Sequence, residues 1–287
     1  MSRIDVRKTY KLYINGAFPR SESGRSYEVL DAKGRFVANA ALASRKDARD
    51  AVVAARKAFT GWSHANAYLR GQIVYRIAEV MESRRAQFVS DLIVSEGLTE
   101  ARANRAVDAA IDRIVWYAGW ADKLPAVLGN ANAVSGPYFN FSIPEPSGVI
   151  AVVAPEDSSL LALVSVVIPV IVAGNTCVVI SSRTRPLPAV TWAECLATSD
   201  VPAGVVNLLT GDRMEIAPWL ASHRDVDGID LSGVADAELA RTLEAAAAGN
   251  LKRFARPDAE EDWAVRPNLR RLSRFIETKT VWHPIGV

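Results

Sequence analysis

The fold of this chain is decided by Gly148-Val-Ile-Ala-Val-Val-Ala-Pro155, an unbroken apolar run that ends in proline. A strand without apolar and polar alternation is typical of a parallel sheet that is covered on both faces. Further apolar runs predict strands at Cys177–Ile180, Val205–Leu208, Gly228–Leu231 and Leu251–Phe254. Helix-length segments separate these runs, and parallel strands require such crossover connections. Residues 148–254 therefore predict an α/β fold with a Rossmann-like parallel sheet.

The segments between these strands predict helices at Leu160–Ala173, Leu187–Thr198, Arg213–Ala221 and Ala235–Ala248. The first of them is the part of the chain that comes closest to a membrane span. It is too short, because a spanning helix takes about 20 apolar residues, and it contains Ser165 and Pro169. We interpret it as a buried helix and expect no membrane partner.

Residues 1–136 are expected to form an N-terminal helical part. Lys11–Gly16 and Tyr27–Leu30 predict two short strands that each run into a turn. Ser44 stands in the N-cap position of a first helix, which Gly61 is expected to end. Further helices with one apolar face follow as far as Trp120.

The next segment, residues 137–147, predicts a strand. Phe139, Phe141 and Ile143 alternate with polar residues, so we expect these three side chains on one buried side of the strand. Pro144 and Pro146 are expected to end the strand and to prevent pairing beyond it.

The last part of the chain changes character twice. Residues 255–274 are polar, with Pro257, Pro267 and the acidic run Asp258-Ala259-Glu260-Glu261-Asp262, and they predict a connecting loop. Residues 275–287 include Phe275–Trp282, which is dense in strand-forming residues and needs a sheet to join.

Composition excludes several classes of function. Lys and Arg number 34 against 32 Asp and Glu, so no strong overall field would concentrate nucleic acid or an anionic membrane. The only cysteines, Cys177 and Cys195, do not form a spacing that builds a zinc or redox site. A reducing cytoplasm is the expected compartment. The polar, basic start of the chain predicts neither a signal peptide nor a transit sequence.

Several of these segments resemble the aldehyde dehydrogenase superfamily. The resemblance rests on the residue 148–155 run, Val172-Ala-Gly-Asn-Thr176, Val201-Pro-Ala-Gly-Val-Val-Asn207, Thr210-Gly211, Asp225-Val-Asp-Gly-Ile229 and Ser232-Gly233. It covers roughly Lys8 to Asn250 and the last dozen residues, in the family's order. Pro144-Glu145-Pro146 and Trp282-His283-Pro284 look closest to the branch, sometimes numbered sixteen, whose members include noncatalytic domains. The resemblance implies that residues 1–136 and 148–254 form the cofactor-type domain, and that residues 137–147 and 275–287 form a β-strand oligomerisation arm.

Activity does not follow from fold, so each site position has to be compared with the family. In active members the residues after the Pro155 equivalent are usually Trp and Asn, and the Asn helps to stabilise an oxyanion. Here they are Glu156 and Asp157, which would repel a developing negative charge. Asp157 as a general base is an alternative, but no nucleophile lies nearby in sequence. The plainer interpretation is a solvated loop that caps a helix beginning near Ser159.

The cofactor positions also depart from the family. Ile180 stands where a ribose-binding Lys is usual, and Arg183 where an acid favours NAD. Arg183 with Arg185 would suit a 2′-phosphate, although surface arginines are the plainer interpretation. The family's phosphate-contacting Gly-Ser pair appears as Gly233-Val234, which keeps the glycine and loses the hydroxyl. We therefore expect no bound cofactor.

No catalytic residue is expected either. The stretch 251–257 contains no acid where the resemblance implies a glutamate base, and the chain reaches its closing strand about twenty residues later, so residues 255–274 are interpreted as a linker that replaces the catalytic domain. Cys177 and Cys195 are expected to be structural, because burial suppresses the thiolate. His64, His223 and His283 are far apart in sequence, and no metal site is predicted.

These departures predict a catalytically inactive subunit that pairs with a full-length aldehyde dehydrogenase paralogue in a hetero-oligomer. An exposed apolar edge aggregates unless a partner covers it. The expected interface residues are Tyr138, Phe139, Phe141, Ile143, Ile276, Val281 and Trp282. The alternative is a chain that binds NAD or NADP and is active alone or by complementation with another chain. A decayed gene product is disfavoured because the closing strand is kept.

Overall fold

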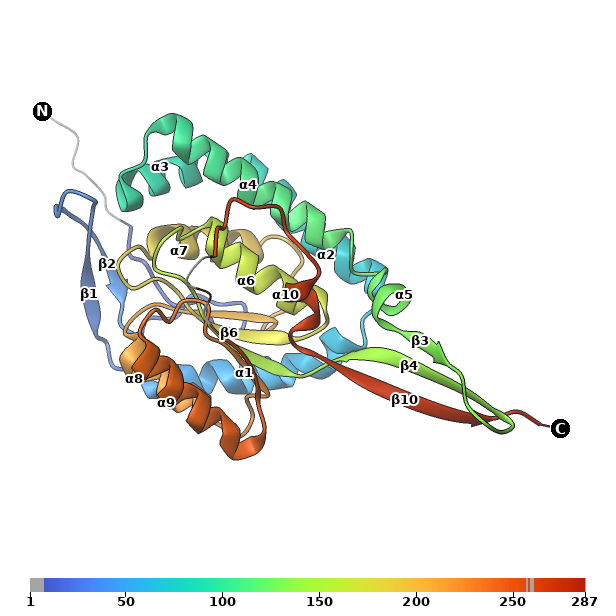
Figure 1. The fold of residues 1–287 in the computed structure, drawn as a ribbon. Coiled ribbons are helices and arrows are strands. Elements are labelled where there is room, and N and C mark those ends of the chain that lie inside the picture. The colour runs from blue at the N-terminus through green and yellow to red at the C-terminus, as the bar shows by residue number, and fades with distance from the viewer. Residues whose placement is uncertain (1–7, 257, 259–260, 287) are drawn as a thin grey trace, which may run out of the picture.

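A computed structural model describes residues 8–286 apart from 257, 259 and 260, and a five-stranded parallel sheet forms its centre (Figure 1). The strand order is β7-β6-β5-β8-β9. All five predicted runs form strands, with bounds within two residues of those expected: β5 Val149–Val153, β6 Thr176–Ile180, β7 Val206–Leu209, β8 Gly228–Asp230 and β9 Arg253–Ala255. The Rossmann-like parallel sheet is confirmed.

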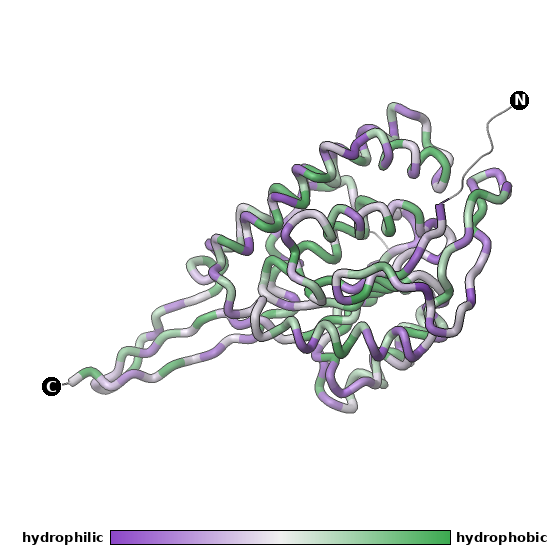
Figure 2. Tube along the Cα trace, turned by 180° about the vertical axis from the view of Figure 1, so that it is seen from behind, coloured by the Kyte–Doolittle hydropathy of each residue, from purple (hydrophilic) through white to green (hydrophobic). Residues whose placement is uncertain are grey.

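Helices cover both faces of this sheet, and each face has its own apolar core. On one face lie α6 (Leu161–Val172) and α7 (Leu187–Leu196), with α2 (Ala67–Ser83), α3 (Arg85–Glu96) and α4 (Glu100–Ala118) outside them. On the other face lie α1 (Arg45–Ser63), α8 (Arg213–Ser222) and α9 (Ala237–Ala247). Figure 2 shows hydrophobic residues gathered along the central strands, as expected for strands buried on both faces.

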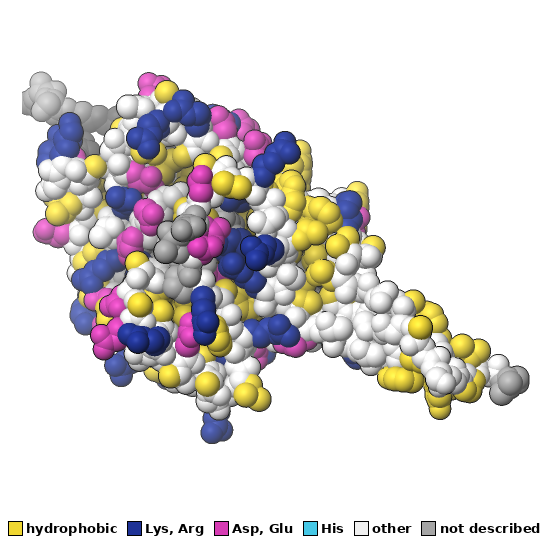
Figure 3. Space-filling view, in the orientation of Figure 1, with side chains coloured by type: hydrophobic (Ala, Val, Ile, Leu, Met, Phe, Trp, Pro, Cys, Tyr) yellow, Lys and Arg dark blue, Asp and Glu magenta, His cyan; other side chains and the backbone are white. Residues whose placement is uncertain are grey.

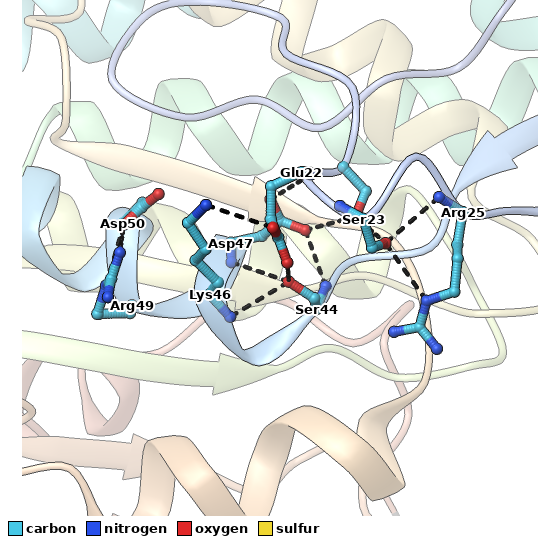
Figure 4. A network of polar contacts seen from close by, with 9 residues as sticks. Glu22, Ser23, Arg25, Ser44, Lys46, Asp47, Arg49 and Asp50 are labelled. Carbon is cyan, nitrogen blue, oxygen red and sulfur yellow. Dashed lines mark hydrogen bonds and ion pairs between the residues drawn. The ribbon is translucent and has the colours of Figure 1, made fainter.

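The start of α1 confirms the predicted N-cap. The Ser44 hydroxyl accepts hydrogen bonds from the backbone N–H groups of Lys46 and Asp47, and the Asp47 carboxylate accepts one from the Ser44 N–H (Figure 4). This reciprocal pair is a capping box. The prediction that Gly61 ends the helix is wrong, since α1 continues to Ser63. Glycine weakens a helix without stopping it when its φ stays negative.

The two strands expected before α1 differ in outcome. Tyr27–Leu30 forms most of β1 (Ser26–Leu30), which pairs with β2 (Phe36–Ala41). The Lys11–Gly16 segment makes only isolated bridges, among them Tyr13 with Leu208, and turns at Asn15 and Gly16 with positive φ. A full strand is not formed there.

A three-stranded antiparallel sheet projects from the body and is called the arm here (Figures 1 and 2). After the short helix α5 (Leu124–Leu128), its strands are β3 (Asn130–Asn132), β4 (Tyr138–Pro146) and β10 (Ile276–Pro284), in the order β10-β4-β3. The prediction that Pro144 and Pro146 end pairing is wrong, because both pair with β10. On the edge that faces β3, β4 is paired only as far as Ser142. Because Pro144 and Pro146 lie beyond that point, the N–H groups that they lack would have had no partner on this edge.

The arm also corrects the expected buried side of β4. Phe139 is 50% exposed, whereas Asn140 on the opposite face is 3% exposed. The side chain of Asn132 on β3 donates a hydrogen bond of 2.5 Å to the Asn140 amide oxygen and so encloses it. Because the arm points away from the body, no described residue of the core covers the face that carries Phe139 and Phe141.

The segment between β9 and β10 is anchored rather than a free polar loop. From α4, the buried Arg113 donates hydrogen bonds to the carbonyl oxygens of Trp263 (2.8 Å) and Val265 (2.6 Å). A short helix, α10 (Arg270–Ser273), contributes the buried Arg271, which forms an ion pair with Glu261. Part of the acidic run, Ala259 and Glu260, lies outside the described residues, as does Pro257.

Among the described helices, none has both the length and the apolarity to cross a bilayer. The described part of the chain also brings together no group of three or more His, Cys, Asp or Glu side chains that would hold a metal ion.

Candidate functional site

A cleft of about 700 Å³ opens at the carboxyl ends of β5 and β8. In open α/β sheets ligands bind at this edge. Five of the seven family cofactor positions line the cleft together: Pro155, Glu156, Asp157, Gly233 and Val234. A larger groove of about 850 Å³ lies between α2 and α4, but it belongs to the outer helix layer, away from the strand ends. The cleft is therefore the candidate site.

The two remaining positions, Ile180 and Arg183, do not line the cleft. Ile180 is the fully buried last residue of β6. Arg183 is exposed, and its guanidinium forms an ion pair with Asp212, the N-cap of α8. Arg183 is thus already neutralised by a carboxylate of the same chain.

Gly233 allows the turn after β8 to lie directly against β5. Its N–H donates a 2.9 Å hydrogen bond to the Val153 carbonyl. A Cβ at this position would stand 2.1 Å from the Ala154 carbonyl oxygen, which leaves no room for any side chain. Val234 is buried beside it. In this chain the glycine thus allows the turn to pack closely against β5.

Glu156 is held by other segments. The expectation that this loop caps a helix is wrong, although Asp157 in the loop is exposed to solvent. The carboxylate of Glu156 accepts hydrogen bonds from the Ser182 hydroxyl (2.5 Å) and the Arg183 backbone N–H (3.1 Å), and forms an ion pair with Arg213. Helix α6 begins at Leu161 without a side-chain cap. The polar groups of Ser159 instead donate to the Glu96 carboxylate.

Arg213, which was not predicted from the sequence, connects the loop after β5 with the turn after β8. Its side chain is 14% exposed and donates to the carbonyl oxygens of Gly233 and Ala154 as well as to Glu156. Burial by itself would raise the pKa of Glu156, but the Ser182 hydrogen bond and the charge of Arg213 bring that pKa below its ordinary value. The carboxylate is therefore ionised at neutral pH. No sequence pattern signals a contact between residues 57 positions apart.

The charges that line the cleft are mostly negative. Its described lining contains a single guanidinium, that of Arg213. Besides Glu156 it contains four further carboxylates, those of Asp157, Asp236, Asp258 and Glu261. Such a lining opposes a pyrophosphate, since like charges repel most strongly where water is partly excluded. Asp157 is exposed, whereas both cysteines are buried on other elements, Cys177 in β6 and Cys195 in α7.

Both thiols are poor nucleophiles in this fold. Cys177 lies in β6, where complete burial raises its pKa. Cys195 lies in α7, where burial raises its pKa to about 11. A thiol attacks as the thiolate, and a raised pKa reduces that form. The three histidines stand on separate elements: His64 ends α1, His223 ends α8 and His283 lies in β10.

The predicted interface residues all lie on strands of the arm, but one of them is buried against the body. Tyr138, Phe139 and Trp282 are exposed, and the Tyr138 and Trp282 rings meet edge to face at 5.7 Å. Phe141, Ile143 and Val281 are half-buried. Ile276 is only 8% exposed and belongs to the main core. Ile276 is therefore covered by this chain and not available to another. Figure 3 shows hydrophobic side chains gathered toward the tip of the arm.

Comparison with known proteins agrees with this geometry. Residues 18–256 match the family model described as the aldehyde dehydrogenase family. The chain is 31% identical over 259 residues to aldehyde dehydrogenase, cytosolic 1, of Elephantulus edwardii, which covers 88% of this chain and 50% of that protein. It is 30% identical over 252 residues to the putative aldehyde dehydrogenase DhaS of Bacillus subtilis, covering 86% of this chain and 50% of that protein.

Solved structures show the same fold. The HpcC structure from Thermus thermophilus superposes with a TM-score of 0.81 at 26% identity, covering 86% of this chain and 47% of that one. A putative aldehyde dehydrogenase from Burkholderia cenocepacia gives 0.81 at 28% identity, covering 85% and 50%. The chain thus spans about half the length of these relatives.

Proposed function

Because the chain belongs to the aldehyde dehydrogenase family, we propose that it is a catalytically inactive subunit that stabilises or regulates a full-length aldehyde dehydrogenase in a hetero-oligomer. The observation that carries this proposal is the arm. Strand β10 is its outer edge, and among the described residues β10 pairs only with β4. The outward backbone groups of β10 are therefore free to receive another strand.

The side chains of the arm support the same role. Phe139 and Trp282 are 50% and 58% exposed, on opposite faces of the arm. Aromatic residues that a single chain leaves uncovered are typical anchors of an interface. A full-length relative would supply what this chain lacks between β9 and β10, where we assign residues 255–274 to a linker in place of a catalytic domain. We assign residues 137–147 and 275–287 to the interface and 255–274 to the linker.

Two further features support inactivity. The described cysteines are buried and their thiolates are disfavoured. The carboxylates of Glu156 and Asp157 occupy the loop after β5, where an oxyanion would need hydrogen-bond donors. Free buried thiols also fit a reducing compartment, so we assign the protein to the cytoplasm.

The second candidate function is an NAD- or NADP-binding chain. The cleft volume favours it, whereas the acidic lining opposes it. Calorimetric titration with NAD and with NADP distinguishes the two. We expect no measurable binding of either, and saturable binding of one of them would favour the second candidate.

Co-expression tests the proposed function. The chain is expressed alone and together with each full-length aldehyde dehydrogenase of its native host, and the complexes are separated by size. We expect co-purification with one of them. Trp282→Ser on the arm should weaken that complex by about thirtyfold or more, because a buried interface aromatic contributes about 2 kcal/mol or more. Tyr68→Ser, an equally exposed aromatic on α2, is the matched control and should change nothing.

Two results would overturn this function. One is a stable monomer that no paralogue binds. The other is turnover of an aldehyde by the purified chain with NAD or NADP and no other protein present.

A further inference from the structure

A cavity of about 470 Å³ lies where the arm leaves the body, beside α2 and α5, and is called the arm-base cavity here (Figure 1). It is separate from the cleft, since no described residue lines both. Its walls come from the ends of α1, α6 and β4 and from the starts of α2, α5 and β10. A cavity of this size holds a small organic molecule.

Arg70 of α2 lines the arm-base cavity and carries a buried charge. The residue is 9% exposed, and among the residues that the structure describes no carboxylate pairs with it. Both of its side-chain hydrogen bonds are donated by Nη1, to the carbonyl oxygens of Ser63 (3.4 Å) and Ala65 (2.6 Å). Nε is buried and has no hydrogen-bond partner. The edge formed by Nε and Nη2 is therefore left without an acceptor in the described part of the chain.

The described chain buries two other arginines, and both lie near carboxylates. Arg271 forms an ion pair of 2.6 Å with Glu261. Burial lowers the pKa of Arg113, but the charges of Glu261 and Asp262 act in the opposite direction. Burial alone acts on the pKa of Arg70 and lowers it. Because a buried charge without a counter-ion is costly, the unpaired guanidinium of Arg70 indicates a missing partner.

The end of α1 accounts for only one side of this guanidinium. Nη1 of Arg70 binds the carbonyl of Ser63, the last residue of α1, and a cation is stabilised at the carboxyl end of a helix. The opposite edge has no such role. Two parallel N–H groups on one edge of an arginine are the arrangement that binds both oxygens of a carboxylate.

The rest of the lining decides which class of anion fits. Among the other Lys, Arg, Asp and Glu side chains, only Glu145 and Lys279 line the cavity, and they pair with each other at 3.0 Å. Arg70 thus supplies one uncompensated positive charge, which matches a monoanion. Much of the remaining wall is apolar and comes from Phe59, Leu124, Pro125, Pro144, Pro146, Ala173 and Ile276.

We propose that the arm-base cavity binds a small organic monocarboxylate. Its carboxylate pairs with the Nε–Nη2 edge of Arg70, and its apolar body packs against the apolar wall. Because Pro144 and Pro146 belong to β4 and Ile276 to β10, the bound molecule contacts the arm as well as the body. This site goes beyond the proposed function and requires no partner chain.

Sodium benzoate tests the inference on the full native chain. Its binding is measured by calorimetry at constant ionic strength, beside that of benzamide, which has a similar shape without the charge, and of sodium phosphate, which lacks the apolar body. Benzoate should bind at least about tenfold more tightly than either, because it alone combines charge-assisted hydrogen bonds with apolar contact. The Nε–H NMR signal of Arg70 should shift over the same range of benzoate concentration.

Two variants locate the effect. Arg70→Lys keeps a positive charge near the end of α1 but removes the Nε–Nη2 edge, so benzoate should bind about tenfold more weakly or not at all. Arg76→Met is the matched control on the same helix, since Arg76 is exposed and pairs with Glu79. It should bind benzoate as the native chain does. If Arg70→Lys does not fold, the NMR titration of the native chain decides, with the Nε–H signal of Arg76 as the reference.

Three results would overturn the inference. The native chain binds benzoate no more tightly than benzamide or phosphate, a folded Arg70→Lys chain binds it as tightly as the native chain, or the Nε–H signal of Arg70 responds no more than that of Arg76. Each would leave the proposed partner role untouched, because that role depends on the free edge of β10 and is measured by co-purification.

Discussion

Replacing Gly233 by alanine tests how the edge of the cleft is packed. The added Cβ would stand 2.1 Å from the Ala154 carbonyl oxygen and 2.6 Å from that of Val153, whereas ordinary contact begins at 3.4 Å. The turn must therefore retreat from β5 by roughly 1.3 Å, the difference between 3.4 and 2.1 Å. That movement strains the Gly233 N–H to Val153 hydrogen bond. A lost hydrogen bond costs about 1 kcal/mol and overpacking about 1–3 kcal/mol, so we expect a loss of about 2–4 kcal/mol.

Urea denaturation followed by circular dichroism measures this loss. The transition midpoint should fall while its slope stays constant. The matched control is Gly61→Ala in α1, where an added Cβ meets nothing within 4 Å. That change should raise the free energy of unfolding by about 0.5–1 kcal/mol, because alanine favours a helix. The same substitution should thus lower the free energy of unfolding at position 233 and raise it at position 61. Native-like stability of Gly233→Ala would refute the close approach of the turn to β5.

Two further predictions concern buried groups. Because burial raises the pKa of Cys195 to about 11, the unfolded chain releases this proton first, so stability is full below about pH 8.5 and falls as pH rises toward 11. Urea midpoints at pH 8 and pH 10.5 should differ less in Cys195→Ala, and an equal difference in both proteins would contradict the assignment. Arg113→Met should speed tryptic cleavage within residues 255–274 by about tenfold, since the carbonyls of Trp263 and Val265 lose their donor. Arg105→Met, at an exposed position of the same helix, is the control and should cleave as the native chain does.

The sequence predicted the central sheet well because its signal is local. An apolar run such as Val149–Val153 predicts a strand buried on both faces from its own residues, and the capping of α1 by Ser44 needs only three neighbouring residues. The errors arose where a neighbour in space decides the outcome. Pro144 and Pro146 remain in β4 because only one edge is paired there, and this depends on where β3 stops.

The candidate site was predicted only in part for the same reason. The loop after β5 and the glycine at 233 were found from their place in the chain, and the structure brings them to one cleft. The partners of Glu156 were not found, since Ser182 and Arg213 follow it by 26 and 57 positions. The anchoring role of Arg113 was missed too, because its bonds span about 150 residues. Contacts of this kind leave no periodic pattern.

The arm also has a consequence for synthesis of the protein. Ser142 of β4 meets Thr280 of β10 across 138 residues of chain. At about 5–20 residues per second, a ribosome takes roughly 7–28 s to synthesise the 138 residues that separate them. During this time β4 has left the ribosome before its long partner strand exists. Until β10 is made, the β10-facing edge of β4 has no partner strand in its own chain. The timing of translation therefore affects whether β10 or a strand of another folded chain pairs with this edge first.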